Sequence, residues 1–219
     1  MIQNTFSNNT SDNMASLNPT ISAKDASHII NYGGKYTITL KDGIGNPIEG
    51  KRVSFTLNGK NISYRLTDSK GAASIQLTAK ILKTAKYGKK NLIITFDDSN
   101  YNKVIKTVKI TVNKEKTKLV AKNTKFKKSK KTKKKYTVKL KNSKGNAIKK
   151  VKVRLKVKGK TFYAKTNSKG HATFKIKKLS KKGKYTAKIT FKSTALYKGA
   201  NKKVKITLII IKSLSNNRN

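Results

Sequence analysis

The sequence predicts an all-β fold made of two tandem antiparallel β-sandwich domains, and three observations carry this prediction. The chain of 219 residues repeats a series of blocks at a period of about 95–100 residues. Most blocks alternate apolar and polar residues, which is the pattern of a strand with one buried face. Short turns of the form Asp/Asn-x-x-Gly separate the blocks. The length suits two domains of about 100 residues each.

The repeat consists of six blocks that occur in the same order in both halves. Residues 36–40 match 136–140, 45–48 match 145–148, 53–60 match 153–160, 67–71 match 166–170, 94–96 match 189–191, and 108–111 match 204–207. About seven short strands per repeat, with turns every 8–12 residues, are typical of a β-sandwich. We therefore expect domains at 17–112 and 117–208, a short linker at 113–116, and tails at 1–16 and 209–219.

The second repeat has the clearest strands. Apolar residues take every other position of 151–157, 172–176 and 185–191, and lysine, arginine or threonine fill the positions between them. This period of two predicts half-buried antiparallel strands. Residues 78–86 (TAKILKTAK) could form one helical turn. Because the matching part of the second repeat is short and contains glycine, we predict a loop there.

The turns have a chemistry of their own. Four of them place Asp or Asn at the first position and Gly at the fourth: 42–45, 68–71, 142–145 and 167–170. This is the signature of a type I turn in which the Asp or Asn side chain accepts hydrogen bonds from the backbone that follows.

The charge of the chain is large and uneven. The formal net charge is +46, yet residues 1–115 have 17 Lys and Arg against all 8 Asp and Glu, a net of +9. Residues 116–219 have 37 Lys and Arg and no acidic residue, a net of +37. A field this strong attracts polyanions without sequence preference. Only four of the 54 basic residues are Arg, which argues against base-specific reading of DNA, where bidentate Arg leads.

The sharpest basic feature is the segment 123–135, which reads NTKFKKSKKTKKK. The matching segment 23–35 reads AKDASHIINYGGK and is nearly neutral, so the fold does not require the charge. Two interpretations stay open, a polyanion-binding patch and a solvated lysine-rich surface. The candidate binding residues are Lys125, Lys127, Lys128, Lys130, Lys131, Lys133, Lys134 and Lys135.

Catalytic and metal-binding residue patterns are not found. The chain has no Cys, which excludes a disulfide, a thiolate nucleophile and a cysteine-bound metal. His28 and His171 have no partners at useful spacing for zinc. Asp97 and Asp98 could bind calcium, but the second repeat has no acid at the matching positions, so a polar turn is the better interpretation. We expect no enzyme, no metal and no cofactor.

Several of these motifs are similar to a known family. Residues 36–40, the Gly-Asn-Pro-Ile of 45–48, the Val-x-Phe of 53–55, the Thr-Asp-x-x-Gly-x-Ala of 67–73 and the Val-Lys-Ile-Thr-Val of 108–112 resemble the immunoglobulin-like domains of methanogen adhesin-like proteins. Those domains are related in style to the invasin and intimin type. The resemblance covers about 190 residues. It implies immunoglobulin-like domains that act as stalks or adhesive modules. The protein would lie on the cell surface or be secreted.

The ends of the chain lead to further expectations. The N-terminus has no signal-peptide pattern, and the apolar stretch 206–211 is too short for a membrane span, so we expect no membrane insertion. Residues 4–9 resemble the last rung of an Asn-rich β-helix. We therefore expect the chain to be a fragment of a larger protein, and we expect its domains to be monomeric modules of that protein. The expected partners are anionic cell-wall or surface polysaccharides, or glycans of a host or partner cell. Nucleic acid is expected only as a non-specific partner. The alternative function is an intracellular basic protein that binds polyanions or nucleic acid.

Overall fold

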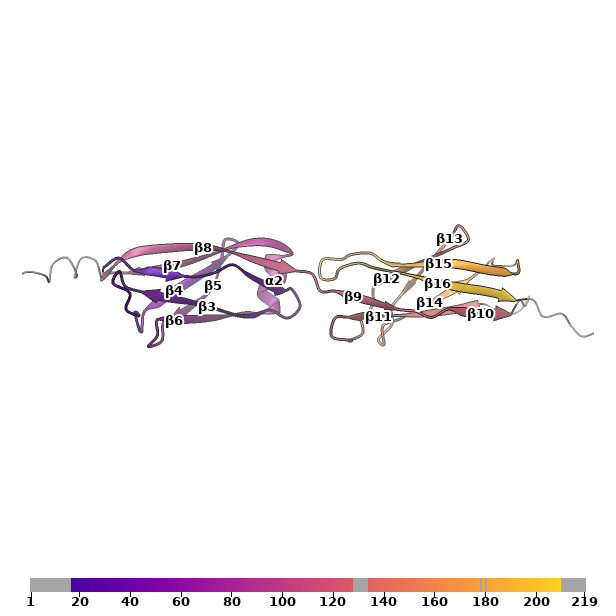
Figure 1. Cartoon of the computed structure of the whole chain (residues 1–219), viewed down its shortest axis with the longest axis horizontal. Helices are drawn as coiled ribbons and strands as arrows, with labels where there is room; N and C mark the ends of the chain where they lie inside the picture. Colours follow the sequence, from indigo (N-terminus) through magenta and orange to yellow (C-terminus); the bar gives the residue numbers. More distant parts are fainter. Residues whose placement is uncertain (1–16, 128–133, 178, 180, 210–219) are drawn as a thin grey trace, which may run out of the picture. The chain divides into compact units, whose positions relative to one another are not determined.

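The chain forms two compact units, residues 1–114 and residues 115–219. The computed structural model describes residues 17–127, 134–177, 179 and 181–209. Figure 1 shows that each unit consists of two layers of strands. The two units are described separately below as unit 1 and unit 2.

Within its described residues, unit 1 contains eight strands and one helix. The three-stranded sheet has the order β1-β3-β6, and the five-stranded sheet has the order β2-β8-β7-β4-β5. The elements are β1 (Thr20–Ser22), β2 (Ala26–Ile29), β3 (Gly34–Lys41), β4 (Arg52–Leu57), β5 (Lys60–Leu66), β6 (Ala72–Leu77), α2 (Ala79–Ala85), β7 (Gly88–Asp98) and β8 (Tyr101–Asn113).

Unit 2 repeats this topology within its described residues. Its three-stranded sheet has the order β14-β11-β9, and its five-stranded sheet has the order β10-β16-β15-β12-β13. The strands are β9 (Thr117–Val120), β10 (Thr124–Lys127), β11 (Lys134–Asn142), β12 (Lys152–Val157), β13 (Lys160–Lys165), β14 (His171–Ile176), β15 (Gly183–Phe191) and β16 (Ala200–Ile209). The predicted pair of all-β sandwiches is confirmed.

The N-terminal strand of each unit is divided between the two sheets. In unit 1, β1 pairs antiparallel with β3, and the chain then crosses to the other sheet, where β2 pairs parallel with β8. In unit 2, β9 pairs with β11 and β10 pairs parallel with β16 in the same way. The sequence predicts about seven strands and only antiparallel pairing. The structure differs because the crossing strand contributes one segment to each sheet.

A buried tyrosine holds each crossing in place. The hydroxyl of Tyr36 donates to the carbonyl of Lys24 at 2.6 Å, and that of Tyr136 donates to the carbonyl of Lys122 at 2.7 Å. Tyr36 is 6% exposed and Tyr136 is 5% exposed. Burial raises the pKa of both phenols above the ordinary value of 10.0, and the negative charge of Asp25 adds to the increase for Tyr36.

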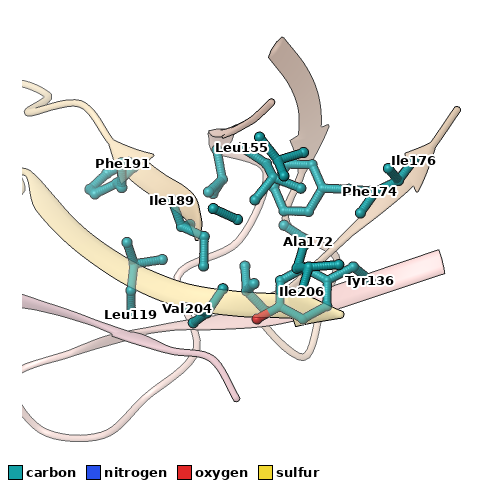
Figure 2. Packing of buried hydrophobic residues seen from close by; sticks show 14 of the residues in the cluster. Leu119, Tyr136, Leu155, Ala172, Phe174, Ile176, Ile189, Phe191, Val204 and Ile206 are labelled. Carbon is teal, nitrogen blue, oxygen red and sulfur yellow. The ribbon is translucent and has the colours of Figure 1, made fainter. Parts of the chain in front are cut away.

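The inward-facing residues of both sheets form the core of each unit. Alternation along β12 and β15 buries one face of each strand and leaves the other in solvent. Figure 2 shows the apolar side chains from the two sheets of unit 2 meeting in one cluster, among them Tyr136, Leu155, Phe174, Ile189 and Ile206. Each unit therefore encloses an apolar core of its own, drawn from both of its sheets.

The segment predicted as a loop at 78–86 contains a helix. The Thr78 hydroxyl accepts a hydrogen bond from the Ile81 N–H at 3.3 Å and so caps the N-terminus of α2. Leu82 is fully buried and Ala85 is buried, so the helix covers one end of the sandwich. In unit 2 Leu179, which follows β14, is also buried. Within the described residues, no helix has the length and apolar character needed to cross a membrane.

The four predicted Asx turns are present. In each turn the backbone N–H of the glycine donates to the carbonyl of the first residue at 2.8–3.2 Å, and the Asp or Asn side chain accepts two backbone N–H bonds. Gly170 also lies against β11, where its carbonyl accepts a bond from the Leu140 N–H at 2.9 Å. Gly71 makes the same contact with Leu40 in unit 1.

The close approach at Gly170 gives a test with an internal control. Gly145 and Gly170 both have positive φ, +83° and +75°, so alanine is strained at either position. An added Cβ at position 170 would lie 2.7 Å from the Leu140 carbonyl oxygen, whereas at 145 it would meet no atom within 4 Å. We expect Gly145→Ala to lower the free energy of unfolding by about 1–2 kcal/mol, and Gly170→Ala to lower it by about 1–3 kcal/mol more. Urea unfolding measures both, and equal losses would contradict the close contact.

The tyrosine hydrogen bond gives a second test. Tyr136→Phe removes the donor to the Lys122 carbonyl, so we expect unit 2 to lose about 1 kcal/mol of unfolding free energy at pH 7. Because the folded-state pKa is raised, the hydroxyl stabilises the fold fully below the unfolded pKa, and this stabilisation is lost as pH rises through the folded pKa. Denaturant unfolding is expected to show a difference between the two proteins that shrinks above about pH 10. The two proteins differ only in this hydroxyl, so a stability difference that does not depend on pH would refute the assignment.

Candidate functional site

Three aspartates of unit 1 have asparagine at the matching positions of unit 2, and the hydrogen bonds are kept. The matching pairs are Asp25 and Asn123, Asp42 and Asn142, and Asp68 and Asn167. Every one of these side chains accepts backbone N–H bonds through Oδ1, at 2.7–3.1 Å. In unit 1 the N–H groups of Ala72 and Lys70 hold the pKa of Asp68 below its ordinary value. In unit 2 neutral asparagine amides accept the same hydrogen bonds, so unit 2 lacks the three negative charges that these positions have in unit 1.

Glu115 lies at the start of unit 2. The predicted linker 113–116 is divided between the units, because Asn113 ends β8 and Glu115 lies inside unit 2. Its backbone N–H donates to the Leu196 carbonyl at 2.9 Å, and its Oε1 accepts from the Ser143 hydroxyl at 3.0 Å. Unit 2 therefore includes one acidic side chain, because residues 116–219 have none. Since Glu115 is 1% exposed, this carboxylate does not belong to the basic surface.

Basic residues gather on the outward side of the five-stranded sheet of unit 2. We call this surface the five-stranded outer face. The alternating burial of β10, β12, β13, β15 and β16 places ten basic side chains on it: Lys125, Lys127, Lys152, Arg154, Lys156, Lys165, Lys184, Lys188, Lys203 and Lys205. The strand pattern in the sequence predicts that these side chains are exposed. Only the strand order brings them together on one face.

Three lysines of this face stand directly opposite one another. Lys156 on β12 is the partner of Lys188 on β15, and Lys188 is the partner of Lys203 on β16. Neighbouring strands lie about 4.8 Å apart, so the row places three positive charges across about 10 Å. The same register positions of unit 1 are Thr56, Ile93 and Thr107. We call the three residues of unit 2 the lysine row.

Arg154 lies beside the lysine row, two residues along β12. Its neighbours across the sheet are Tyr163 on β13 and Thr190 on β15. The Arg154 Nε and the Thr190 Oγ1 are buried and have no hydrogen-bond partner within the described residues. The Lys152 ammonium lies 4.3 Å from the centroid of the Tyr163 ring, and Arg52 and Tyr64 of unit 1 are arranged similarly at 3.8 Å.

The three-stranded sheet of unit 2 presents a second basic face. Lys135 on β11 faces Lys175 on β14, and Lys141 on β11 faces Lys118 on β9. In the described strands of unit 1, each lysine with a cross-strand partner faces a neutral residue. Lys35, for example, faces Gln76. Opposed lysines are thus a feature of unit 2 on both of its sheets.

The structure separates the lysines that the sequence places in one patch. Lys125 and Lys127 lie on β10, at the edge of the five-stranded sheet. Lys134 and Lys135 lie on β11, in the three-stranded sheet. The remaining candidates, Lys128, Lys130, Lys131 and Lys133, lie outside the described residues.

The acidic turn of unit 1 pairs with lysines. The Asp98 carboxylate accepts from Lys51 at 2.9 Å, and that of Asp97 accepts from Lys103 at 2.7 Å. The bond from Lys51 and that from the Asn100 N–H hold the pKa of Asp98 below its ordinary value. Among the described residues, no group of three His, Cys, Asp or Glu side chains is placed to hold a metal ion.

Unit 1 has a cavity of about 390 Å³ between the β4–β5 hairpin and α2. Apolar side chains such as Leu57, Ile62 and Ile81 line it together with Lys60 and Lys80. In unit 2 the hollow lined by Val157, Phe162 and Leu179 has no room for a water molecule.

Comparisons with known proteins define the fold. No family model and no curated protein sequence matches the chain. Among solved structures, invasin, a bacterial integrin-binding protein, has a TM-score of 0.50 and 17% identity, covering 88% of this chain and 39% of its own. The fibronectin(III)-like modules of Clostridium thermocellum CbhA have a TM-score of 0.34 and 16% identity, with 92% and 99% coverage. The Yersinia pseudotuberculosis adhesin InvE has a TM-score of 0.38 and 17% identity, and the match covers 87% of this chain and 59% of InvE. The chain consists of two immunoglobulin-like β-sandwich domains.

Proposed function

We propose that the chain is a non-catalytic adhesion module of a cell-surface protein of the adhesin-like type. In this proposal unit 2 attaches to anionic polymers, and unit 1 acts as a less charged spacer. The immunoglobulin-like fold that the chain shares with invasin supports the class of protein. The expected polymers are acidic polysaccharides of a cell wall or of a partner cell. Of the residues predicted to bind, Lys125 and Lys127 lie on the five-stranded outer face, and Lys135 lies on the three-stranded sheet of unit 2.

The observation that carries the proposal is the exchange of Asp for Asn at matched positions. Asn123, Asn142 and Asn167 accept the same backbone bonds as the aspartates of unit 1, so the fold is served equally by either residue. The exchange does remove three negative charges from a domain that already has opposed lysines. A surface with high positive charge and very few acids is suited to binding a polyanion through release of its counterions.

The alternative, an intracellular basic protein that binds nucleic acid, is favoured by the same net charge. Antibody labelling of intact cells separates the two functions. The adhesion proposal expects labelling without permeabilisation of the cells. Labelling that requires permeabilisation would support the intracellular alternative and contradict a surface module.

Polymer binding by the separate units provides the direct test. Chains 1–114 and 115–219 are each expected to fold, because each unit encloses its own core. In a salt titration, chain 115–219 is expected to bind polygalacturonate at least about tenfold more tightly than chain 1–114 at 50 mM salt, with a steep loss by 200 mM. Neutral dextran is the control polymer, and equal binding by the two chains would contradict the proposal.

The asparagines supply a matched variant for this titration. The triple variant Asn123→Asp, Asn142→Asp, Asn167→Asp places the residues of unit 1 in unit 2. We expect it to keep the hydrogen bonds and the unfolding midpoint, because aspartate accepts the same bonds in unit 1. Binding to polygalacturonate is expected to weaken, because three negative charges now oppose the polymer. If the variant binds polygalacturonate as tightly as wild type, the absence of these three acids does not contribute to polymer binding.

A further inference from the structure

The lysine row is an arrangement that a sheet does not need and that works against its stability. Like charges directly opposite one another on a sheet face destabilise the strand pair. Unit 1 has the same strands in the same register and occupies these positions with Thr56, Ile93 and Thr107. The row in unit 2 is therefore a property of the outer surface and not of the fold.

Arg154 adds a group of different geometry beside the row. A guanidinium presents planar pairs of N–H donors that match the two oxygens of a carboxylate or sulfate. Within the described part of the chain, the Arg154 Nε and the neighbouring Thr190 Oγ1 are both buried and have no hydrogen-bond partner. Thr190 is in turn opposite Asn201 on β16, so a neutral hydroxyl and an amide lie next to the lysine row, in the same cross-strand row as Arg154.

This mixture of groups favours one class of polymer. A row of cations beside hydroxyl and amide groups suits a chain that has both carboxylates and hydroxyls, as an acidic polysaccharide does. Proteins that bind single-stranded nucleic acid stack its unpaired bases on aromatic side chains. The ring of Tyr163, the aromatic side chain that this face exposes, already has the Lys152 ammonium 4.3 Å from its centroid.

We infer that the five-stranded outer face of unit 2 binds a linear acidic polysaccharide that runs across the strands. The lysine row holds successive anionic groups, and Arg154 holds one of them through paired N–H bonds. This inference rests on the proposed function and deepens it, because it names the surface and the class of polymer.

The test uses the full chain and two triple variants. The face variant is Lys156→Thr, Lys188→Thr, Lys203→Thr, which removes the lysine row. The control variant is Lys118→Thr, Lys139→Thr, Lys175→Gln, which removes the same charge from the three-stranded sheet. Its replacements are the residues that unit 1 has at the matching positions, Thr20, Thr39 and Gln76. Binding to polygalacturonate is measured as a function of salt, with double-stranded DNA as competitor.

We expect the face variant to make the slope of log K against log salt shallower by about 2–3, and the control variant to change it by less than about 1. The face variant is also expected to unfold at a higher temperature than wild type at low salt, because the opposed charges are gone. Arg154→Lys keeps the charge, so we expect weaker binding with an unchanged salt slope.

The possible results separate the inference from the proposed function. If the wild-type chain does not bind polygalacturonate, both fail. If it binds and the face and control variants weaken it equally, the inference fails and the proposed function stands. Competition by DNA at the same concentration of anionic groups would overturn the assignment to a polysaccharide, because it would mean that charge alone decides binding.

Discussion

The alternation of side chains along each strand is the constraint on which the rest of the structure depends. In a two-layer sandwich every strand buries one face against the opposite sheet and exposes the other. The buried positions match closely between the units, as with Phe55 and Leu155 or Ile94 and Ile189. The outward positions have no partner layer, so packing does not restrict them. Charge can therefore change on the outside while the core is kept.

Unit 2 illustrates how far that freedom extends. Its outward positions have lysines directly opposite lysines, and its turns use Asn where unit 1 uses Asp. Each exposed lysine pair costs little, since water and salt screen the charges at the surface. The buried Glu115 is different, because it accepts from Ser143 inside the domain and cannot neutralise the face. The positive surface is thus compatible with a stable fold and available for a ligand.

The divided first strand joins the two layers of each unit. The crossing from β1 to β2 ends where Asp25 accepts the Lys109 N–H, and Asn123 accepts the Lys205 N–H in unit 2. The same crossings are held by the hydrogen bonds from the Tyr36 and Tyr136 hydroxyls to the carbonyls of Lys24 and Lys122. Repetition of these bonds in both units indicates that the fold depends on them, in contrast to the outward residues, which differ.

The sequence by itself determined the repeat, the strands and the Asx turns, because periodicity and turn residues are local properties of the chain. It did not determine the helix at Ala79–Ala85, whose stability comes from packing Leu82 into the core. It grouped Lys125 with Lys135, whereas the fold places them on different sheets. It also left Lys156, Lys188 and Lys203 as unrelated exposed positions. Only the order and register of the strands make these three neighbours, because contacts between strands distant in sequence are decided by how the sheets assemble.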